Sequence, residues 1–340
     1  MRIEKFTNLY RDVTKEGTKI PQEKYCLTGQ FPIVDQGQRV IAGWWNDDAG
    51  IFKNVPAIIF GDHTRAIKYM EQPFFIGADG VKILRPTNIK DNPKYLYYAL
   101  QAAKIPNLGY SRHFKVVKEL QICIYSRDEQ NEIVRVLEKI DYLIEQRHAE
   151  TTYLDQLVKS RFIELFGDYD LTHPQESWVT IKEIGTVVGG ATPKTDHDEY
   201  WGGSYRWITP AELDGDSGYI YDSVRKLTKA GVESCSLQEM PVGTVILSSR
   251  APIGKVAIAG NTFYCNQGFK NIICKEGITP RYLYTVLLLN VEYLNSLGRG
   301  ATFKEISKGI VESIRIPVPS MELQQQFAAF VEQTDKSKYY

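Results

Sequence analysis

The sequence lacks the features that would place it in a membrane or in an oxidising compartment. No apolar run approaches the ~18 residues that a membrane-spanning helix needs, and the opening MRIEKFTNLYRD lacks the apolar segment of a signal peptide. The 5 cysteines are scattered, with no C-x-x-C pair. Such a set indicates reduced thiols rather than a disulfide framework or a zinc site. We therefore expect a cytoplasmic protein.

Net charge is also absent. The chain carries 41 basic and 41 acidic residues, so its bulk charge gives no argument for nucleic-acid binding. With 340 residues, of which 43% are hydrophobic, it has the composition of a globular protein with room for two domains. A nucleic-acid function would have to come from where the basic side chains lie.

Recognisable catalytic motifs are missing as well. No G-x-x-x-x-G-K-[ST], H-E-x-x-H or G-x-S-x-G pattern occurs, and the 5 histidines lie far apart. One stretch, GDHTR at 61–65, does resemble an active site because it places an aspartate, a histidine and an arginine together. A metal-dependent nuclease that uses Asp62 and His63 is therefore one alternative. A chain of this length without recognisable chemistry is more typical of a recognition or scaffold protein.

An internal repeat is the most informative feature. NPKYLYYALQ from Asn92 reappears as TPRYLYTVLL from Thr279, so that Pro93 and Pro280 lie 187 residues apart. Each copy follows two apolar segments around a polar loop and precedes a glycine-rich basic loop, a strand-like stretch and a helix start. In the helix starts, Gln130 matches Gln324 at an offset of 194. The chain is thus a tandem of two strand-rich domains, each followed by a helix.

The first of these helices is predicted over residues 127–166. Ser126 and Glu129 form a capping-box pattern, and Gly167 provides a stop. Ile133, Ile140 and Leu154 share one heptad position. At ~1.5 Å per residue the helix would be roughly 58 Å long, and its apolar stripe needs a partner. A coiled-coil spacer fits this pattern, and a plain interdomain helix is the alternative.

The repeat and the central helix together resemble the DNA-specificity (S) subunit of type I restriction-modification systems. The resemblance covers nearly the whole chain. It is carried by FPIVDQG, IIFGDHTR and FFIGADGVKIL in the first half, by YWGGSYRWITPAEL, GTVILSSRAPIGKVAI and CNQGFKNI in the second, and by the helix openings DEQNEIV and ELQQQFA.

The resemblance implies an α+β protein with two β-rich target recognition domains, 1–125 and 168–319, and helices at 127–166 and 320–340 that form an antiparallel coiled-coil spacer. Each domain would recognise one half of a bipartite site in double-stranded DNA. The helices would set the spacing and dock the modification (methyltransferase) subunits, which act with a restriction (translocase/endonuclease) subunit. The chain itself would be non-catalytic and bind no cofactor, whereas S-adenosylmethionine, ATP and Mg would act in the partner subunits.

Under this interpretation GDHTR is a loop that holds DNA. Arg65 supplies a bidentate donor suited to guanine or phosphate, Asp62 and His63 support the loop, and Arg250 in SSRAPIGK takes the matching place in the second half. The candidate DNA-binding residues are Arg65, Lys68, Lys82, Arg112, His113, Lys115, Thr192, Lys194, Thr195, Arg250, Lys255, Lys270, Arg299 and Lys304.

The second helix has only the residues from Ser320 onward, so the sequence predicts that it is truncated. We expect the distal part of the first helix, around Leu154, Leu157, Val158 and Phe162, to lack its partner. A second copy of the chain, a separately encoded half-subunit or the modification subunits would then cover it. A further alternative is a silent recombination copy of a specificity subunit that needs completion in trans.

Overall fold

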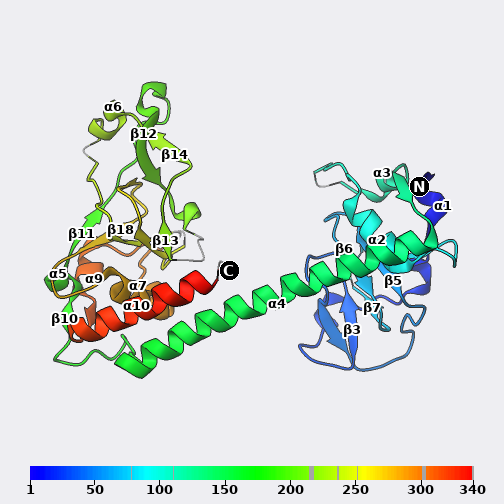
Figure 1. Cartoon of the computed structure of the whole chain (residues 1–340), viewed down its shortest axis with the longest axis horizontal. Coiled ribbons are helices and arrows are strands. Elements are labelled where there is room, and N and C mark those ends of the chain that lie inside the picture. Colours follow the sequence, from blue (N-terminus) through cyan, green and yellow to red (C-terminus); the bar gives the residue numbers. More distant parts are fainter. Residues whose placement is uncertain are drawn as a thin grey trace. The chain divides into compact units, whose positions relative to one another are not determined.

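The structure, a computed structural model, describes residues 1–77, 79–109, 111–213, 218–235, 237–250, 252–300 and 304–338. The chain divides into two compact units, unit 1 (Met1–Arg147) and unit 2 (His148–Tyr340). The division falls inside the long helix α4 (Arg127–Phe166), which therefore contributes to both units (Figure 1). Each unit combines small sheets with helices, and the predicted α+β class is confirmed.

The described residues of unit 1 form three sheets. A four-stranded antiparallel sheet has the order β2-β8-β5-β6, a three-stranded sheet has the order β4-β3-β7, and β1 pairs with β9. The strands are β1 (Arg2–Lys5), β2 (Tyr10–Asp12), β3 (Phe31–Val34), β4 (Gly43–Trp45), β5 (Ala57–Gly61), β6 (Ile67–Met70), β7 (Phe75–Ile76), β8 (Val81–Pro86) and β9 (Gln121–Ile124). The helices are α1 (Phe6–Leu9), α2 (Pro93–Ala102), α3 (Phe114–Val117) and the first half of α4.

Unit 2 repeats this plan with a larger sheet of order β11-β18-β15-β16-β13, a three-stranded sheet β14-β12-β17 and the pair β10-β19. Its strands are β10 (Val179–Thr180), β11 (Gly185–Gly189), β12 (Trp201–Ile208), β13 (Tyr219–Ile220), β14 (Arg225–Leu227), β15 (Val245–Leu247), β16 (Val256–Ala259), β17 (Tyr264–Cys265), β18 (Lys270–Cys274) and β19 (Arg315–Ile316). Its helices, besides the end of α4, are α5 (Ile181–Ile184), α6 (Lys229–Glu233), α7 (Pro280–Leu289), α8 (Val291–Ser296), α9 (Lys308–Ser313) and α10 (Met321–Ser337).

The internal repeat extends to single hydrogen bonds. The Gln130 amide accepts from the Asn92 N–H at 2.7 Å, and Gln324 accepts from the Thr279 N–H at 2.8 Å. Both glutamines are buried, where an unpaired amide would be costly. They therefore fix the starts of α4 and α10 against the N-terminal caps of α2 and α7, which explains why glutamine recurs there.

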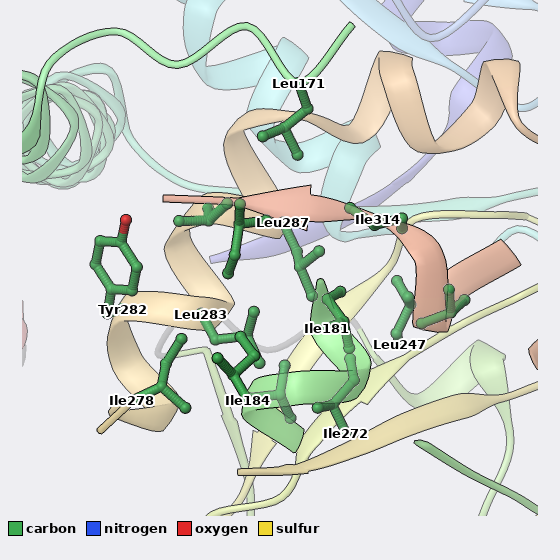
Figure 2. Packing of buried hydrophobic residues seen from close by; sticks show 14 of the residues in the cluster. Leu171, Ile181, Ile184, Leu247, Ile272, Ile278, Tyr282, Leu283, Leu287 and Ile314 are labelled. Atoms are coloured by element: carbon green, nitrogen blue, oxygen red, sulfur yellow. The ribbon is translucent and has the colours of Figure 1, made fainter. Parts of the chain in front are cut away.

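The core of unit 2 lies between α7, the sheet and the two long helices. Figure 2 shows Leu283 and Leu287 of α7 facing Ile181 and Ile272. These four side chains are fully buried. At about 25 cal/mol per Å² of apolar surface removed from water, such side chains contribute most of the stability of the unit.

The helix α4 begins and terminates at the residues that its sequence indicates. Ser126 and Glu129 exchange capping hydrogen bonds, with the Glu129 carboxylate accepting from the Ser126 N–H at 2.9 Å. Gly167, at φ 91°, terminates the helix in a conformation that favours glycine. Among the described residues, no helix has the length and apolarity to span a membrane.

The prediction that the distal part of α4 lacks a partner is wrong. Phe162 is 2% exposed, and its ring lies 5.4 Å from the ring of Phe327 in α10. Val158 packs on the same core, and Lys338 at the end of α10 bonds to Asp155 at 2.7 Å. The two helices are antiparallel, so the first residues of α10 meet the last residues of α4.

The exposed apolar side chains of α4 lie mostly nearer its middle. Val136, Ile140, Leu143 and Ile144 are 49%, 45%, 51% and 50% exposed, and Leu157 is 49% exposed. Among the described residues, the exposed apolar stripe of α4 therefore lies mainly in unit 1.

Candidate nucleic-acid interface

The loop Gly61–Arg65 connects β5 to β6 in a tight hairpin. The Arg65 N–H donates to the Gly61 carbonyl at 2.8 Å, and Arg65 has a φ of 62°. A Cβ on Gly61 would lie 2.8 Å from the Gln36 carbonyl oxygen, so only glycine fits there. The Thr64 hydroxyl donates to that same carbonyl. The loop is thus tied to the segment that follows β3.

Asp62 is a structural residue of this loop. Its side chain is 3% exposed, and its carboxylate accepts from the Phe114 N–H at 2.7 Å. Its backbone carbonyl accepts from the His113 N–H at 2.8 Å and faces His113 Nδ1 at 2.9 Å. Since the Leu108 N–H donates to His113 Nε2 at 3.1 Å, Nδ1 carries the proton and donates to Asp62. Asp62 and fully buried His113 therefore join the hairpin to the segment before α3.

The basic side chains nearest the hairpin are already paired. The Arg65 guanidinium donates from Nη1 to the Ile105 carbonyl at 3.2 Å, which leaves its other N–H groups for a ligand. The Lys82 ammonium lies 3.2 Å from an Asp12 carboxylate oxygen and 4.9 Å from the centre of the Phe114 ring. Burial opposes ionisation of Asp12, but hydrogen bonds from Thr14 and the charge of Lys82 lower its pKa overall.

Lys68 and Lys255 play similar roles from different positions, because Lys68 pairs with Ile59 in unit 1 whereas Ala257, not Lys255, pairs with the matching Ile246 in unit 2. Lys68 is 4% exposed, and its ammonium donates to the Asp35 carbonyl at 2.7 Å; burial lowers the pKa of Lys68 despite the adjacent Asp35 carboxylate. The Lys255 ammonium donates to the Pro210 carbonyl at 3.1 Å. Each lysine thus supports the loop that follows β3 or β12.

The exposed basic residues of unit 1 lie beside this buried network. Arg112 and Lys115 flank His113 and point to solvent. The pKa of the exposed Asp79 is lowered by its hydrogen bond to Lys19, by the charge of Lys19 and by the nearby Arg112. The segments 61–65, 79–80, 105–109 and 111–115 therefore come together with Lys19. Sequence reasoning missed Lys19 because it lies far from all of them in sequence.

The second unit contains a related hairpin whose loop is two residues longer, since the Gly61 N–H donates to the Ala66 carbonyl and the Ser248 N–H donates to the Lys255 carbonyl. The Ser249 N–H donates to the Gly268 carbonyl at 2.7 Å, as the Asp62 N–H does to Gly80 at 2.7 Å. Ser249 is thus the counterpart of Asp62, and Arg250 corresponds to His63 rather than to Arg65. The predicted match between Arg250 and Arg65 is wrong. The backbone hydrogen bonds align Ser249 with Asp62, so the two arginines do not occupy the same position.

Around this second loop, basic residues gather near Glu305. The Lys270 ammonium lies 3.1 Å from the Glu305 carboxylate and 3.3 Å from the Ser249 hydroxyl. The backbones of Arg250 and Arg299 both bridge to Glu305, and Lys304 is its exposed neighbour. Four predicted residues of unit 2 are thus brought together: Arg250, Lys270, Arg299 and Lys304.

The remaining predicted residues lie on the segment 191–195. Thr192, Lys194 and Thr195 are exposed. The Thr192 hydroxyl donates to the Gln267 amide oxygen at 2.6 Å, which adds exposed Gln267 to the candidate surface. The sequence could have indicated Gln267, because it lies in the same segment, NQGFK, as the predicted Lys270. The Lys194 carbonyl accepts from the Trp201 indole at 3.2 Å, and the Arg225 guanidinium stacks 3.4 Å above that indole ring. This aromatic and cationic cluster carries no motif in the sequence.

Both units thus present a loop cluster with exposed basic and amide side chains over a fixed backbone. Among the described residues, no group of three or more His, Cys, Asp or Glu side chains could hold a metal ion. Guanidinium, ammonium and amide groups of this kind suit phosphates and the edges of bases.

Comparison with known proteins also finds two matching halves in the chain. The family model described as type I restriction modification DNA specificity domain matches residues 10–153 and 176–339. The MjaIX specificity subunit of Methanocaldococcus jannaschii is 43% identical over 185 residues, which is 53% of this chain and 43% of that protein. The EcoR124I/EcoR124II specificity subunit of Escherichia coli is 26% identical over 346 aligned positions, 93% of this chain and 82% of that protein. The crystal structure of the S subunit from M. genitalium has a TM-score of 0.61 at 16% identity, covering 99% of this chain and 90% of that one.

Proposed function

This chain belongs to the type I restriction modification DNA specificity family, and we propose that it recognises a bipartite DNA sequence and directs methyltransferase and endonuclease subunits to it. In this role it is a non-catalytic recognition subunit. Recognition takes place in the cytoplasm, and S-adenosylmethionine, ATP and Mg act in the partner subunits.

The observation that carries the proposal is the duplicated loop. The Asp62 and Ser249 N–H groups make equivalent hydrogen bonds to the Gly80 and Gly268 carbonyls, but the loops that follow differ in length and in side chains. A common scaffold with different contact residues is what two half-sites of unrelated sequence require. A catalytic Asp62–His63 pair would also need a carboxylate that a substrate can reach, whereas Asp62 is 3% exposed and its carboxylate accepts from the Phe114 N–H.

We assign the candidate residues to two roles. Lys68, His113 and Lys255 position loops, because their polar atoms are bonded to backbone groups inside the protein. The others contact DNA directly: Arg65, Lys82, Arg112, Lys115, Thr192, Lys194, Thr195, Arg250, Lys270, Arg299 and Lys304. Gln267 joins them through its bond to Thr192.

The expected partners are double-stranded DNA, the modification subunits and the restriction subunit. The exposed stripe of α4 around Ile140 needs a cover, which a second copy of the chain, a half-subunit or the modification subunits would provide. A silent recombination copy would have the same fold, and co-purification with a modification subunit from native cells distinguishes it from a working subunit.

The experiment is methylome sequencing. The chain alone should neither methylate nor cleave DNA, and with its modification subunit and S-adenosylmethionine it should direct methylation to one bipartite sequence. Arg65→Ala should relax recognition of one half-site and Arg250→Ala that of the other, each by about ten- to a hundredfold, since a base contact contributes ~1–3 kcal/mol. Methylation by the chain alone, or both variants degrading one half-site, would contradict the proposal.

A further inference from the structure

The strand β14 of unit 2 holds an arginine side chain against an aromatic surface formed by Trp201 and Trp207. The Arg225 guanidinium lies 3.4 Å from the centre of the Trp201 ring and 5.5 Å from that of Trp207. The two indole rings meet edge to face, with their centres 5.1 Å apart, and Trp207 is buried. Contact with an aromatic face stabilises a cation and leaves the N–H groups of the guanidinium, which lie in its own plane, open to hydrogen bonding.

Both tryptophans are fixed to the segment 191–195, which carries predicted DNA-binding residues. The Trp201 indole N–H donates to the Lys194 carbonyl at 3.2 Å, and the Trp207 indole N–H donates to the Ala191 carbonyl at 3.1 Å. Figure 1 shows β12 and β14 together at the end of unit 2 that lies away from α10. The aromatic surface is therefore part of the second loop cluster and has a fixed position in it.

Two other basic residues beside Arg225 are paired with a carboxylate. Side chains of a strand alternate between its two faces, so Lys226 faces away from the aromatic surface, on which buried Leu227 packs. The Lys226 ammonium and the Arg206 guanidinium lie 3.1 Å and 3.2 Å from one Asp222 carboxylate oxygen. In the part of unit 2 that the structure describes, the exposed Arg225 contacts aromatic rings and has no carboxylate partner. Its N–H groups are therefore available to a ligand.

The same position in unit 1 carries a glycine. In unit 1 Ile33 pairs with Gly43 and with the first residue of β7. In unit 2 Trp207 pairs in the same way with Arg225 and with the first residue of β17, so Gly43 is the counterpart of Arg225. A Cβ on Gly43 would lie 2.8 Å from the Tyr25 Cβ. The Tyr25 side chain thus fills in unit 1 the space that an arginine side chain enters in unit 2.

This difference favours a contact with a base over a contact with a phosphate. Phosphate contacts carry no sequence information, so a repeated scaffold can keep the same ones in both units, whereas the bases of two unrelated half-sites need different contacts. Arginine pairs with guanine through two hydrogen bonds, to O6 and N7 in the major groove, and this is the commonest specific contact between proteins and DNA. A guanidinium whose plane is already fixed by an indole ring loses little freedom when it forms such a pair.

We propose that Arg225 recognises a guanine in the half-site bound by unit 2, with its guanidinium donating to O6 and N7 of that base. Trp201 is a positioning residue, because it holds the plane of the guanidinium. The inference rests on the proposed function, and it adds one base to a half-site whose sequence that function leaves open.

The test is methylome sequencing of the full chain with its modification subunit and S-adenosylmethionine. Arg225→Ala should relax the choice of base at one guanine of one half-site by about ten- to a hundredfold, the range of a bidentate base contact, and leave the other half-site unchanged. Arg225→Lys keeps the charge but not the planar pair of donors, so it should relax the same position. Trp201→Ala should relax that position less strongly and no other.

Lys226→Ala is the matched control, since Lys226 is the next residue of β14 and its charge is paired with Asp222. It should leave every base preference unchanged, and thermal unfolding checks that all variants fold. The contact itself is measured with the assembled complex and a duplex in which 7-deazaguanine, which lacks the N7 acceptor, replaces that guanine. The replacement should weaken binding by the unchanged chain about tenfold and leave binding by Arg225→Ala unchanged.

Two kinds of result would overturn the inference. In the first, Arg225→Ala lowers methylation at all sites alike and reduces the slope of log affinity against log salt by about 0.9, which would make Arg225 a phosphate contact. In the second, the Arg225 variants keep the recognition sequence or relax it at a base other than guanine. If the unchanged chain directs no methylation, the proposed function and this inference both fail. If it directs methylation to a bipartite sequence that the Arg225 variants keep, only this inference fails.

Discussion

Asp62→Ala is the sharpest test of how the first recognition loop is built. The Asp62 carboxylate is 3% exposed and accepts one hydrogen bond, from the Phe114 N–H at 2.7 Å. Removing it leaves a buried donor without an acceptor, next to a ring that packs in the core of unit 1. The bonds from His113 go to the backbone carbonyl of residue 62 and survive the change. The perturbation is therefore confined to one charged acceptor.

A hydrogen bond to a charged group contributes about 1.5–3 kcal/mol, so we expect unit 1 to lose about that much stability. For a unit of this size each kcal/mol corresponds to about 3 °C, which predicts a decrease of about 5–9 °C in its Tm. Differential scanning calorimetry measures it. Asp62→Asn keeps an acceptor and should lose less.

The matched control is Ser249→Ala in unit 2. The Ser249 N–H makes the same hydrogen bond to a glycine carbonyl, but its hydroxyl accepts a 3.3 Å bond from Lys270, so the cost should stay below about 1 kcal/mol. If Asp62→Ala is as stable as the unchanged chain, the carboxylate does not support the loop. Cleavage of DNA by the unchanged chain, abolished in a fully stable Asp62→Ala, would restore the nuclease alternative.

Three further predictions concern single side chains. Lys68→Met should destabilise unit 1 by about 1–3 kcal/mol, because it leaves the Asp35 carbonyl without its donor, and should weaken DNA binding by loosening the loop at Asp35. Unchanged stability in calorimetry together with unchanged DNA binding would contradict this. Phe162→Ala should destabilise unit 2 by about 3–5 kcal/mol and leave the unfolding transition of unit 1 in place. Burial opposes the charge of Lys338, but its bonds to Asp155 and Asp335 raise its pKa above the ordinary 10.5. The stabilisation of the folded chain by charged Lys338 is therefore present below pH 10.5 and is lost as the pH rises through the raised pKa. Lys338→Met should therefore remove part of the alkaline fall in stability, and an unchanged pH profile would refute the role of this pair.

Local signals account for what the sequence could predict. The helix α4 has a capping box at Ser126, an apolar heptad pattern and a glycine stop at Gly167, each of which acts within a few residues. The helices α2 and α7 begin at Asn92 and Thr279, whose side chains accept the first N–H groups, with a proline next in each case. Such features depend on neighbours in the sequence, and the repeat presents them twice.

The contacts that decide side-chain roles are long-range and left no local signal. The sequence predicts Lys68 as an exposed basic residue of a strand, whereas in the structure its ammonium group donates to the Asp35 carbonyl of a distant loop. The position of α10 follows from the meeting of Phe327 with Phe162, two residues separated by the whole of the second β-rich region. A heptad pattern indicates that an apolar stripe needs a partner helix. It does not indicate which part of the stripe that helix covers.

The division between loop-positioning and DNA-contacting residues leads to a last prediction, on Arg112 and Lys115. Both are exposed and flank His113, whose ring is committed to Asp62 and Leu108. Removing exposed charges costs little stability, so Arg112→Ala with Lys115→Ala should leave the Tm of unit 1 unchanged. Each phosphate contact contributes about 0.9 to the slope of log affinity against log salt, so the double variant should reduce that slope by up to about 2 in the assembled complex. His113→Phe should do the reverse, lowering the Tm while keeping the slope per bound complex. If the double variant binds DNA with the original salt dependence, the surface beside His113 does not face DNA, and recognition by unit 1 must lie elsewhere on its loops.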